Sequence, residues 1–449
     1  MEKIVNLAKR RGFVFPSAEI YGGFGGFWDW GPLGVLLKNN IKNEWWKTFV
    51  QQRDDVVGID GSIITNPKVW EASGHIDNFF DKLVECKKCH RRYKIDVLKS
   101  GKWVTAEGED LEDQSCKNCG ANDWTEPKSF NTMFRTYIGP VEDTASKAFL
   151  RPETAQNIFA NYELVRDTMR LKLPFGIAQI GKAFRNEITP GHFVFRSREF
   201  EQMEIEYFVV PGTDDKWFEK WVTACEQWFF SLGLNKKNLR LRKQSKEELA
   251  HYAKATTDIE YAFPIEKGWA ELTGISNRQD FDLQQHGEFS RKDKSAFATA
   301  VDDEGKVKKV PFVIEPSFGV DRTALAFLLD AYEEQPDRLV LKLHPKLAPY
   351  TVAVFPLLAN KPQLVEKART VYKLLQRRFM TAWDDRGNVG KRYYSQDEIG
   401  TPWCVTVDFD TLEGAKRPKG TVTVRDRDSM VQEDIAIEEL TDYLRAKLT

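Results

Sequence analysis

The chain has 449 residues and a formal net charge of -1. That length is long for one hydrophobic core, so two or three domains are expected. The nearly balanced charge excludes a global attraction to nucleic acid, and any such contact must come from local patches. No stretch is apolar and long enough to span a bilayer, and the N-terminus lacks a signal-peptide core, which favours a cytosolic protein without membrane contact.

The N-terminal region combines a short helix, a glycine-rich stretch and a long amphipathic helix. The glycine-rich residues 22–34 lack the Gly-Lys-Ser/Thr ending of a phosphate-binding loop and indicate a structural turn instead. The helix after them has an apolar stripe, which favours core or a subunit interface and consists of Leu36, Ile41, Trp45, Trp46, Phe49 and Val50. Residues 59–67 predict a strand, and residues 69–75 predict a helical turn.

Two Cys-x-x-Cys pairs lie within residues 83–130. Cys86 and Cys89 form the first pair, and Cys116 and Cys119 form the second. Four thiolates on two tight turns suit the tetrahedral coordination of Zn²⁺, and in a reducing compartment such pairs indicate a metal rather than disulfides. The sequence predicts a structural zinc site in this segment; a remnant without metal is the alternative.

Residues 149–156 contain Pro152 at a predicted helix start, with Glu153 in the first turn. Glu153 either complements the positive end of that helix or faces a pocket.

Residues 184–209 predict two β-strands joined by a loop at residues 189–191. Arg185 and Glu187 would share one face of the first strand. On the second strand, alternation would turn one set of side chains to the same face, namely Arg196, Arg198, Phe200, Gln202, Glu204 and Glu206. Arginines bind phosphate, aromatic rings stack on purines, and carboxylates hold ammonium or Mg²⁺. The alternative is an amphipathic hairpin whose charged face meets water.

The middle of the chain predicts a core helix at 214–232 and strands at 257–263 and 268–276. On the second of these strands, Trp269, Glu271 and Thr273 would share a face. The charged residues 288–310 predict a solvated excursion.

A strand at 313–318 would place Val313, Glu315 and Ser317 on one face, and a helix opens at Gly319. Arg322 lies in the first turn of this helix, where its positive charge is repelled by the positive end of the helix dipole. An anionic ligand bound there would remove this repulsion.

Beyond residue 349 the pattern changes to an α/β alternation. Strands are predicted at 351–355, 381–384, 403–409 and 421–426, and helices at 361–380, 389–399 and 431–447. This spacing predicts a separate α/β domain over residues 349–449.

Three motifs resemble those of class II aminoacyl-tRNA synthetases. Residues 184–187 with Arg196 and Phe200 resemble the second class II motif, residues 319–322 the third, and the early helix leading to Pro67 the first. Residues 151–156, 200–204 and 315–319 resemble the glycine-specific members. Over almost its whole length the chain is similar to the homodimeric bacterial glycyl-tRNA synthetases.

The resemblance implies an α+β fold in three parts. Residues 1–345 would form a catalytic domain, an antiparallel sheet flanked by helices. Residues 83–130 would be a zinc-binding insertion within it, and residues 349–449 an α/β anticodon-binding domain.

The implied activity is that of a glycine–tRNA ligase. With Mg²⁺ as cofactor, glycine and ATP would react to form glycyl-adenylate. The glycyl group would then be transferred to the 3′ end of tRNA(Gly), the macromolecular partner. The enzyme itself would be a homodimer. There are two alternatives. One is a synthetase-like RNA-binding paralogue without aminoacylation activity, and the other is a prolyl, threonyl or histidyl enzyme of class II. The paralogue should lack phosphate-binding arginines, and the other enzymes need pockets for larger side chains.

Residue roles also follow from the resemblance. Arg185, Glu187 and Arg322 would be catalytic. The implied ATP site comprises Arg185, Asn186, Glu187, Phe195, Arg196, Ser197, Arg198, Glu199, Phe200, Glu271, Leu272, Gly319, Val320, Asp321 and Arg322. The implied glycine site comprises Lys94, Glu153, Phe200, Glu201, Gln202, Met203, Glu204, Glu315, Pro316, Ser317, Phe318 and Gly319. Lys94 stands where the family commonly has an arginine. The lysine keeps the positive charge but cannot form the two parallel hydrogen bonds that a guanidinium group forms.

Overall fold

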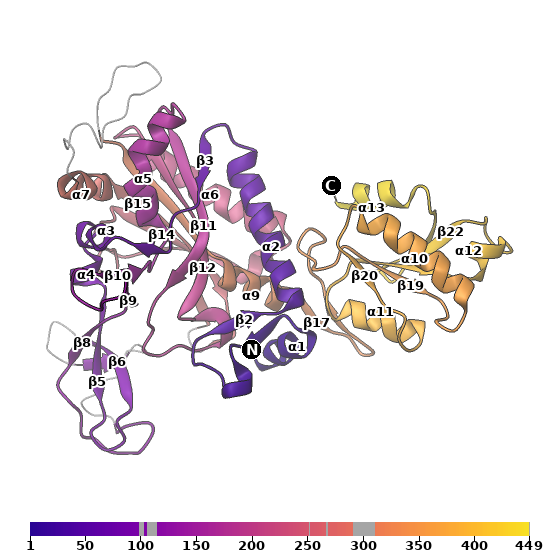
Figure 1. The fold of residues 1–449 in the computed structure, drawn as a ribbon, viewed down its shortest axis with the longest axis horizontal. Coiled ribbons are helices and arrows are strands. Elements are labelled where there is room, and N and C mark those ends of the chain that lie inside the picture. The colour runs from indigo at the N-terminus through magenta and orange to yellow at the C-terminus, as the bar shows by residue number, and fades with distance from the viewer. Residues whose placement is uncertain (98–102, 106–114, 251, 266–267, 291–309, 449) are drawn as a thin grey trace.

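A seven-stranded sheet organises the larger part of the computed structural model, which describes residues 1–97, 103–105, 115–250, 252–265, 268–290 and 310–448 (Figure 1). The strands run in the order β13-β14-β15-β16-β12-β11-β3, and only β3 and β11 pair in parallel. Their bounds are β3 Val56–Ile59, β11 Phe175–Phe184, β12 Glu199–Val209, β13 Leu239–Lys243, β14 Ala255–Ala262, β15 Trp269–Gln279 and β16 Phe312–Gly319.

Helices cover both faces of this sheet. One face packs on α2 (Pro32–Trp46), α6 (Asp214–Ser231) and α9 (Val320–Ala331). Met203, Ile205 and Tyr207 of β12 point into that core and are fully buried, as alternation predicts. The other face packs partly on α5 (Ala155–Thr168) and α7 (Phe281–Phe289), and the rest of it is open.

The N-terminal segment and the cysteine-bearing segment extend this body. The first contains α1 (Glu2–Arg11) and the hairpin of β1 (Val14–Pro16) and β2 (Trp28–Trp30). The helices α3 (Pro67–Ala72) and α4 (His75–Asn78) lead into a four-stranded sheet that projects from the body in Figure 1. That sheet has the order β7-β6-β5-β8, with β5 Phe80–Glu85, β6 Arg92–Val97, β7 Trp103–Thr105 and β8 Lys128–Asn131. A three-stranded sheet beside it joins β4 (Ile64–Thr65), β10 (Lys147–Leu150) and β9 (Arg135–Tyr137).

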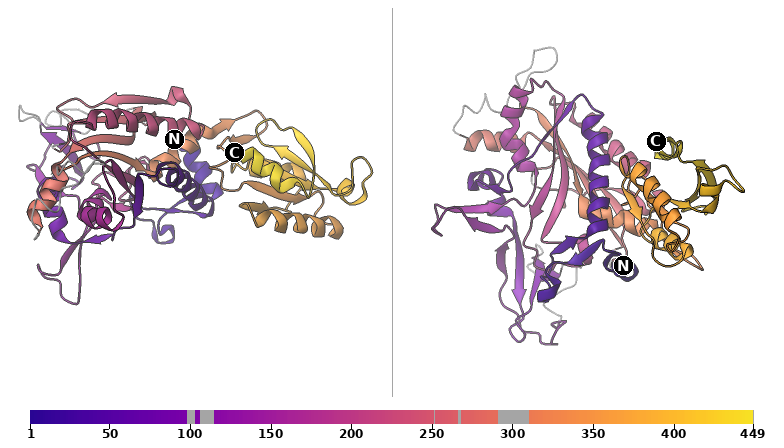
Figure 2. Two further views of the ribbon diagram at one scale, coloured as in Figure 1. Left: turned by 90° about the horizontal axis from the view of Figure 1, so that it is seen from above. Right: turned by 45° about the vertical axis from the view of Figure 1, so that its right-hand side comes forward.

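The C-terminal part is a second body around its own five-stranded sheet (Figure 2). The hairpin of β17 (Tyr332–Glu334) and β18 (Leu339–Leu341) leads into it. The strands β19 Val352–Pro356, β20 Thr381–Trp383, β21 Trp403–Val407, β22 Thr421–Asp426 and β23 Gln432–Ala436 accompany the helices α10 Pro362–Gln376, α11 Val389–Asp397, α12 Phe409–Glu413 and α13 Leu440–Leu448. The predicted helix over 431–447 is wrong in its first half, because residues 432–436 pair with β22 as an edge strand.

The predicted hairpin at 184–209 also needs correction. β11 ends at Phe184 and β12 begins only at Glu199, so Arg185, Glu187, Arg196 and Arg198 lie in the connecting loop and not on strand faces. Residues 192 and 193 take positive φ values of 54° and 61° at the start of a short 3-10 turn, a geometry that a strand ladder does not allow. Of the predicted excursion 288–310, residues 291–309 lie outside the described part of the chain.

Among the described residues, every helix is too short or too polar to serve as a membrane span.

Candidate active site

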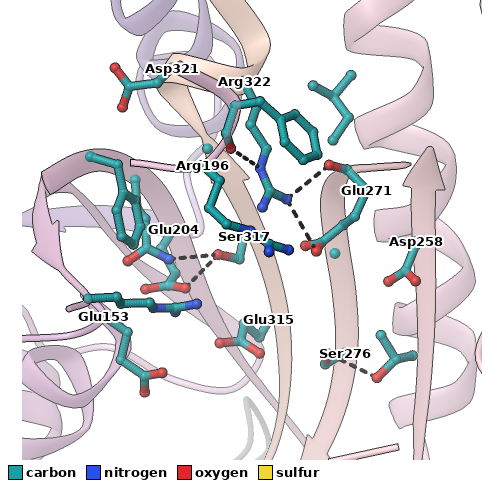
Figure 3. Close-up of a pocket in the computed structure, with 18 of the residues that line it drawn as sticks. Glu153, Arg196, Glu204, Asp258, Glu271, Ser276, Glu315, Ser317, Asp321 and Arg322 are labelled. Carbon is teal, nitrogen blue, oxygen red and sulfur yellow. Dashed lines mark hydrogen bonds and ion pairs between the residues drawn. The ribbon is translucent and has the colours of Figure 1, made fainter. Parts of the chain in front are cut away.

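A cavity of about 410 Å³ opens on the sheet face that α2, α6 and α9 leave uncovered. Its floor is a row of directly opposed residues on four neighbouring strands: Glu204 faces Ser317, Ser317 faces Gly274, and Gly274 faces Asp258. Opposed residues on an antiparallel pair hold their side chains within contact distance. The row therefore fixes the positions of the polar groups that line the cavity (Figure 3).

Glu204 is the central acid at one end of this cavity. Its Oε1 accepts a hydrogen bond from Ser317 Oγ at 2.7 Å, and its Oε2 accepts one from Thr154 Oγ1. The residue is 2% exposed. Burial, and then the neighbouring charge of Glu153, raise the pKa of Glu204 above its ordinary value.

Glu153 lies beside Glu204, at the loop that precedes α5. Its Oε2 is 3.2 Å from His75 Nε2, and its Oε1 accepts a hydrogen bond from Gln156 Nε2 at 3.1 Å. Burial works to raise the pKa of Glu153, but His75 and the arginines Arg278 and Arg185 outweigh it and hold that pKa below its usual range. The carboxyl group is therefore ionised at neutral pH.

Glu315 completes the acidic end of the cavity. Both of its oxygens accept from Arg278 Nη1, at 2.9 and 3.0 Å. Arg278 is 1% exposed and also donates to both oxygens of Asp282, at 2.7 and 2.8 Å. Burial raises the pKa of Glu315 to about 8, against the opposing effect of Arg278. A cluster of carboxylates with so few cations suits a positively charged ligand group.

Guanidinium groups and aromatic rings line other parts of the cavity wall. The Arg185 guanidinium lies 5.3 Å from the ring centre of Phe200, and its Nε donates to Pro152 O at 2.9 Å, beside Glu153. Arg322 lies 4.5 Å from the ring centre of Phe195. These groups offer cations for phosphate oxygens and flat apolar surfaces for a base.

Arg322 is held by its neighbours at the start of α9. Its Nη1 donates to the Glu271 carbonyl at 3.0 Å and lies 3.4 Å from Glu271 Oε2, as Figure 3 shows. The predicted common face of Glu271 and Thr273 is wrong: Ile259 pairs with Thr273 but Glu260 pairs with Glu271, so Leu272 is an extra residue in β15. This bulge turns Glu271 to the cavity and buries Thr273 in the core.

The structure brings most of the predicted site residues to this one cavity. Those in its wall are Glu153, Arg185, Glu187, Phe195, Arg196, Ser197, Phe200, Glu201, Gln202, Glu204, Glu271, Leu272, Glu315, Ser317, Gly319, Asp321 and Arg322. The carboxylates of Asp321 and Glu201 already have a cation, because buried Lys38 lies 2.9 Å from Asp321 and 3.0 Å from Glu201.

Other predicted residues do not belong to the cavity wall. Arg198 donates to Glu187 O at 3.0 Å and to Gly25 O at 2.6 Å, so it holds the loop to the glycine-rich stretch. Lys94 lies on β6, 2.6 Å from Asp81. The remaining ones are Asn186, Glu199, Val320, Met203, Pro316 and Phe318, of which Met203, Val320 and Phe318 point into the core.

Sequence reasoning missed the residues that hold the acids from behind. Arg278, His75 and Thr154 each contact one of the glutamates, and all three are buried. The four-residue spacing of Arg278 and Asp282 was an available signal, since such a spacing is typical of an ion pair on a helical turn.

The four predicted cysteines also come together, on the projecting segment. Their sulfur atoms all lie within 4.8 Å of one another. The Cys86–Cys119 and Cys89–Cys116 Sγ–Sγ distances are both 3.6 Å. Four sulfurs placed tetrahedrally about 2.3 Å from a zinc ion would be about 3.8 Å apart, so the group has the dimensions of a zinc centre.

Comparisons with known proteins agree with this geometry. Residues 140–332 match the family described as tRNA synthetase class II core domain (G, H, P, S and T), and residues 351–447 match the family described as anticodon binding domain. The chain is 52% identical over 465 residues to the glycine–tRNA ligase of Thermobifida fusca (strain YX), with 100% of this chain and 98% of that protein covered.

Two further relatives show the same similarity over the full length. The glycine–tRNA ligase of Alkaliphilus oremlandii (strain OhILAs) is 51% identical over 469 residues, covering 100% of this chain and 98% of the other. That of Geobacillus thermodenitrificans (strain NG80-2) is 50% identical over 468 residues, covering 100% and 97%. With a class II core, an anticodon-binding region and such relatives, the chain belongs to the glycine–tRNA ligase family.

Proposed function

We propose that this protein is a glycine–tRNA ligase that activates glycine with ATP and transfers it to the 3′ end of tRNA(Gly). The observation that carries the proposal is the cavity itself, because the acids Glu153, Glu204 and Glu315 and the guanidinium groups of Arg185 and Arg322 line the same cavity. An α-amino acid with no side chain offers only its ammonium and carboxylate groups, so charge must supply its affinity. A triphosphate requires guanidinium groups, which Arg185 and Arg322 provide.

The first step is an in-line displacement at the α-phosphorus of ATP. The ammonium group of glycine lies among the three glutamates, and a carboxylate oxygen of glycine attacks the α-phosphorus. The bond from that phosphorus to the bridging oxygen breaks, and pyrophosphate leaves. Arg185 neutralises the α-phosphate and Arg322 the γ-phosphate, so positioning and charge stabilisation suffice without a covalent enzyme intermediate.

Two further side chains orient the nucleotide. Phe200 stacks on adenine, and Arg322 covers the opposite face of the ring. Glu187 accepts a hydrogen bond from the adenine amino group. Mg²⁺ bound with ATP would neutralise phosphate charge, and Glu271 of the cavity wall would hold it. In the second step a hydroxyl of the terminal tRNA ribose attacks the glycyl carbonyl carbon, and AMP leaves.

The test is ATP–pyrophosphate exchange measured with glycine, alanine, serine and proline in parallel. We expect exchange with glycine alone, because a methyl group would overlap the acids that surround the ammonium group. Exchange supported by proline or by none of the four amino acids would overturn the proposal. Charging of tRNA(Gly) transcripts then tests the second step.

We also propose that Cys86, Cys89, Cys116 and Cys119 hold a structural zinc ion. The sulfur spacing supports this, and a full set of four ligands leaves no position for a catalytic water. Metal analysis of the purified protein should give one zinc per chain, and a value near zero would reject the site.

Finally, we propose a cytoplasmic homodimer. Exposed apolar side chains on the small three-stranded sheet and its edge, namely Ile64, Tyr137 and Ile138, support an interface. Analytical ultracentrifugation should give twice the chain mass of 51.8 kDa, whereas the single-chain mass at micromolar concentration would refute the dimer.

A further inference from the structure

A fourth glutamate, Glu206, lies behind the acidic end of the cavity. It is two residues beyond Glu204 on β12, so both side chains point to the same face of the sheet. Glu206 is 0% exposed and does not belong to the cavity wall. Within the described part of the chain, neither of its carboxyl oxygens has a hydrogen-bond partner. A buried polar group without a partner requires a physical explanation.

The strand register places Glu206 directly opposite Glu315. On β12 and β16, Glu204 pairs with Ser317 and Tyr207 pairs with Ile314, and the same register sets residue 206 against residue 315. One carboxyl oxygen from each of Glu204, Glu206 and Glu315 lies within 4.8 Å of the other two. Like charges on directly opposed residues repel, and here burial strengthens the repulsion.

The charged groups around Glu206 include one cation, Arg278, which is bound to other carboxylates. Glu204 faces Glu206 from its own strand, Glu315 from β16, Arg278 from the end of β15 and Asp282 from α7. The partner of Glu206 on β11 is Ile177, which is apolar. The side-chain hydrogen bonds of Arg278 go to Glu315 and Asp282. An ionised Glu206 would therefore be a buried charge without a hydrogen-bonded partner among three other carboxyl groups, and such a group takes up a proton instead.

We propose that Glu206 is a neutral carboxylic acid whose hydrogen is shared with Glu315, and that this bond orients the Glu315 carboxylate toward the ammonium group of the substrate. Glu315 is the better acceptor of the two neighbours, because both oxygens of Glu204 already accept hydroxyl donors while those of Glu315 share one N–H donor group. Glu206 is thus a positioning residue, and the inference rests on the proposed function.

The direction of titration is consistent with this assignment. Burial, followed by the neighbouring charge of Glu315, raises the pKa of Glu206 well above its ordinary value. A carboxyl group with a raised pKa keeps its proton to a higher pH than an ordinary glutamate does, which is the behaviour that a neutral Glu206 requires. At least one of the four carboxyl groups at the acidic end is then uncharged when the single positive charge of an ammonium group binds.

Two near-isosteric variants, E206Q and E206L, test the role of Glu206. The amide of E206Q is neutral and can donate to Glu315 in place of the hydroxyl, so its KM for glycine in ATP–pyrophosphate exchange should stay within about twofold of wild type. E206L has no donor, and its KM for glycine should rise about tenfold or more, the usual effect of losing a hydrogen bond to a charged group. The KM for ATP should stay unchanged in both.

Thermal melting separates positioning from folding. E206L should melt no lower than wild type, since leucine removes a buried polar group and keeps the volume. An E206Q as impaired as E206L would show that an ionised carboxylate is needed, and an E206L with normal KM for glycine would show that no positioning occurs. Either result overturns the proposal.

A direct test of the proton does not depend on activity. The infrared difference spectrum of wild type minus E206Q at pH 7 should contain the carbonyl band of a protonated carboxylic acid; its absence overturns the assignment. The two failures are distinguishable: wild-type protein without glycine-dependent exchange refutes the proposed function, while active wild-type protein without this band refutes only the role of Glu206.

Discussion

Replacing Arg278 with methionine should weaken the fold and the glycine site together, in a pH-dependent way. Arg278 is buried and is the cation that both Glu315 and Asp282 contact. It also lies 3.8 Å from the ring centre of Tyr252. Methionine keeps much of the length and apolar volume of the side chain but none of its charge. The substitution therefore leaves two buried carboxylates facing each other across an apolar group.

The magnitude follows from how these carboxylates can respond. Removing one partner of a buried ion pair costs about 3–5 kcal/mol of folding free energy. One of the two carboxylates can instead take up a proton, which costs about 4 kcal/mol at pH 7 for a group with an ordinary pKa near 4.3. The two routes agree in size. For a domain of this length roughly 2 °C of melting temperature correspond to 1 kcal/mol, which gives a loss of roughly 6–10 °C.

The sign of the pH dependence is fixed by the direction of the pKa shift in the variant. Without Arg278, the charge that opposes burial is lost, so the pKa of Glu315 lies further above its ordinary value than in wild type, where it is already about 8. The folded variant then keeps this proton to a higher pH than folded wild type does, and its stability goes on falling above pH 8. The gap between wild type and R278M should therefore widen from pH 8 to pH 9 by up to about 1.4 kcal/mol.

Calorimetric melts of wild type and R278M at pH 7, 8 and 9 measure this difference, and the KM for glycine is measured alongside. K182M is the matched control, because Lys182 pairs with Glu199 at the surface, where such pairs contribute about 0–1 kcal/mol. A loss below about 1 kcal/mol for R278M would refute the reasoning, since burial of an unpaired charge costs more. A gap that stays constant with pH would refute it equally.

Three further substitutions test other parts of the structure. R322A should lower glycine-dependent exchange by about 100-fold or more with unchanged circular dichroism, because it removes a preorganised charge from the transition state; near-normal exchange would reject that role. C86S should lose zinc on dialysis against a chelator, and retained zinc would contradict the four-sulfur site. In G181A the new Cβ would clash with Nη2 of the buried Arg151, so we expect a loss of about 1–3 kcal/mol in a melting experiment. G191A, where nothing lies within 4 Å of the new Cβ, is the control, and equal melting of the two variants would contradict the predicted clash.

Alternation along single strands was enough to predict much of the acidic end. Glu204 on β12 and Glu315 with Ser317 on β16 follow a period of two without interruption, so local sequence determined their common face. The same argument failed at Glu271, because the extra residue Leu272 reverses the alternation and its effect depends on pairing with β14.

Loop geometry and buried partners could not be predicted in the same way. The composition of the loop with Arg185 and Arg196 predicts a strand. Its actual path depends on contacts with distant segments, such as the hydrogen bond that Arg198 N donates to Gly26 O. His75 and Arg278 reach the glutamates from elements far away in sequence, and a single chain without its fold gives no periodic signal for such contacts. The missed strand at 432–436 has the same cause, since its partner β22 determines it.

The row of opposed residues on the central strands has one more consequence. Because Glu204 and Glu315 stand on neighbouring hydrogen-bonded strands, the gap between these two acids is set by the strand separation of about 4.8 Å and not by adjustable loops. Widening that gap would require breaking ladder bonds on several strands at once. The selectivity for glycine over larger amino acids therefore depends on the backbone of the sheet. Substitutions on the surrounding surface leave this selectivity intact.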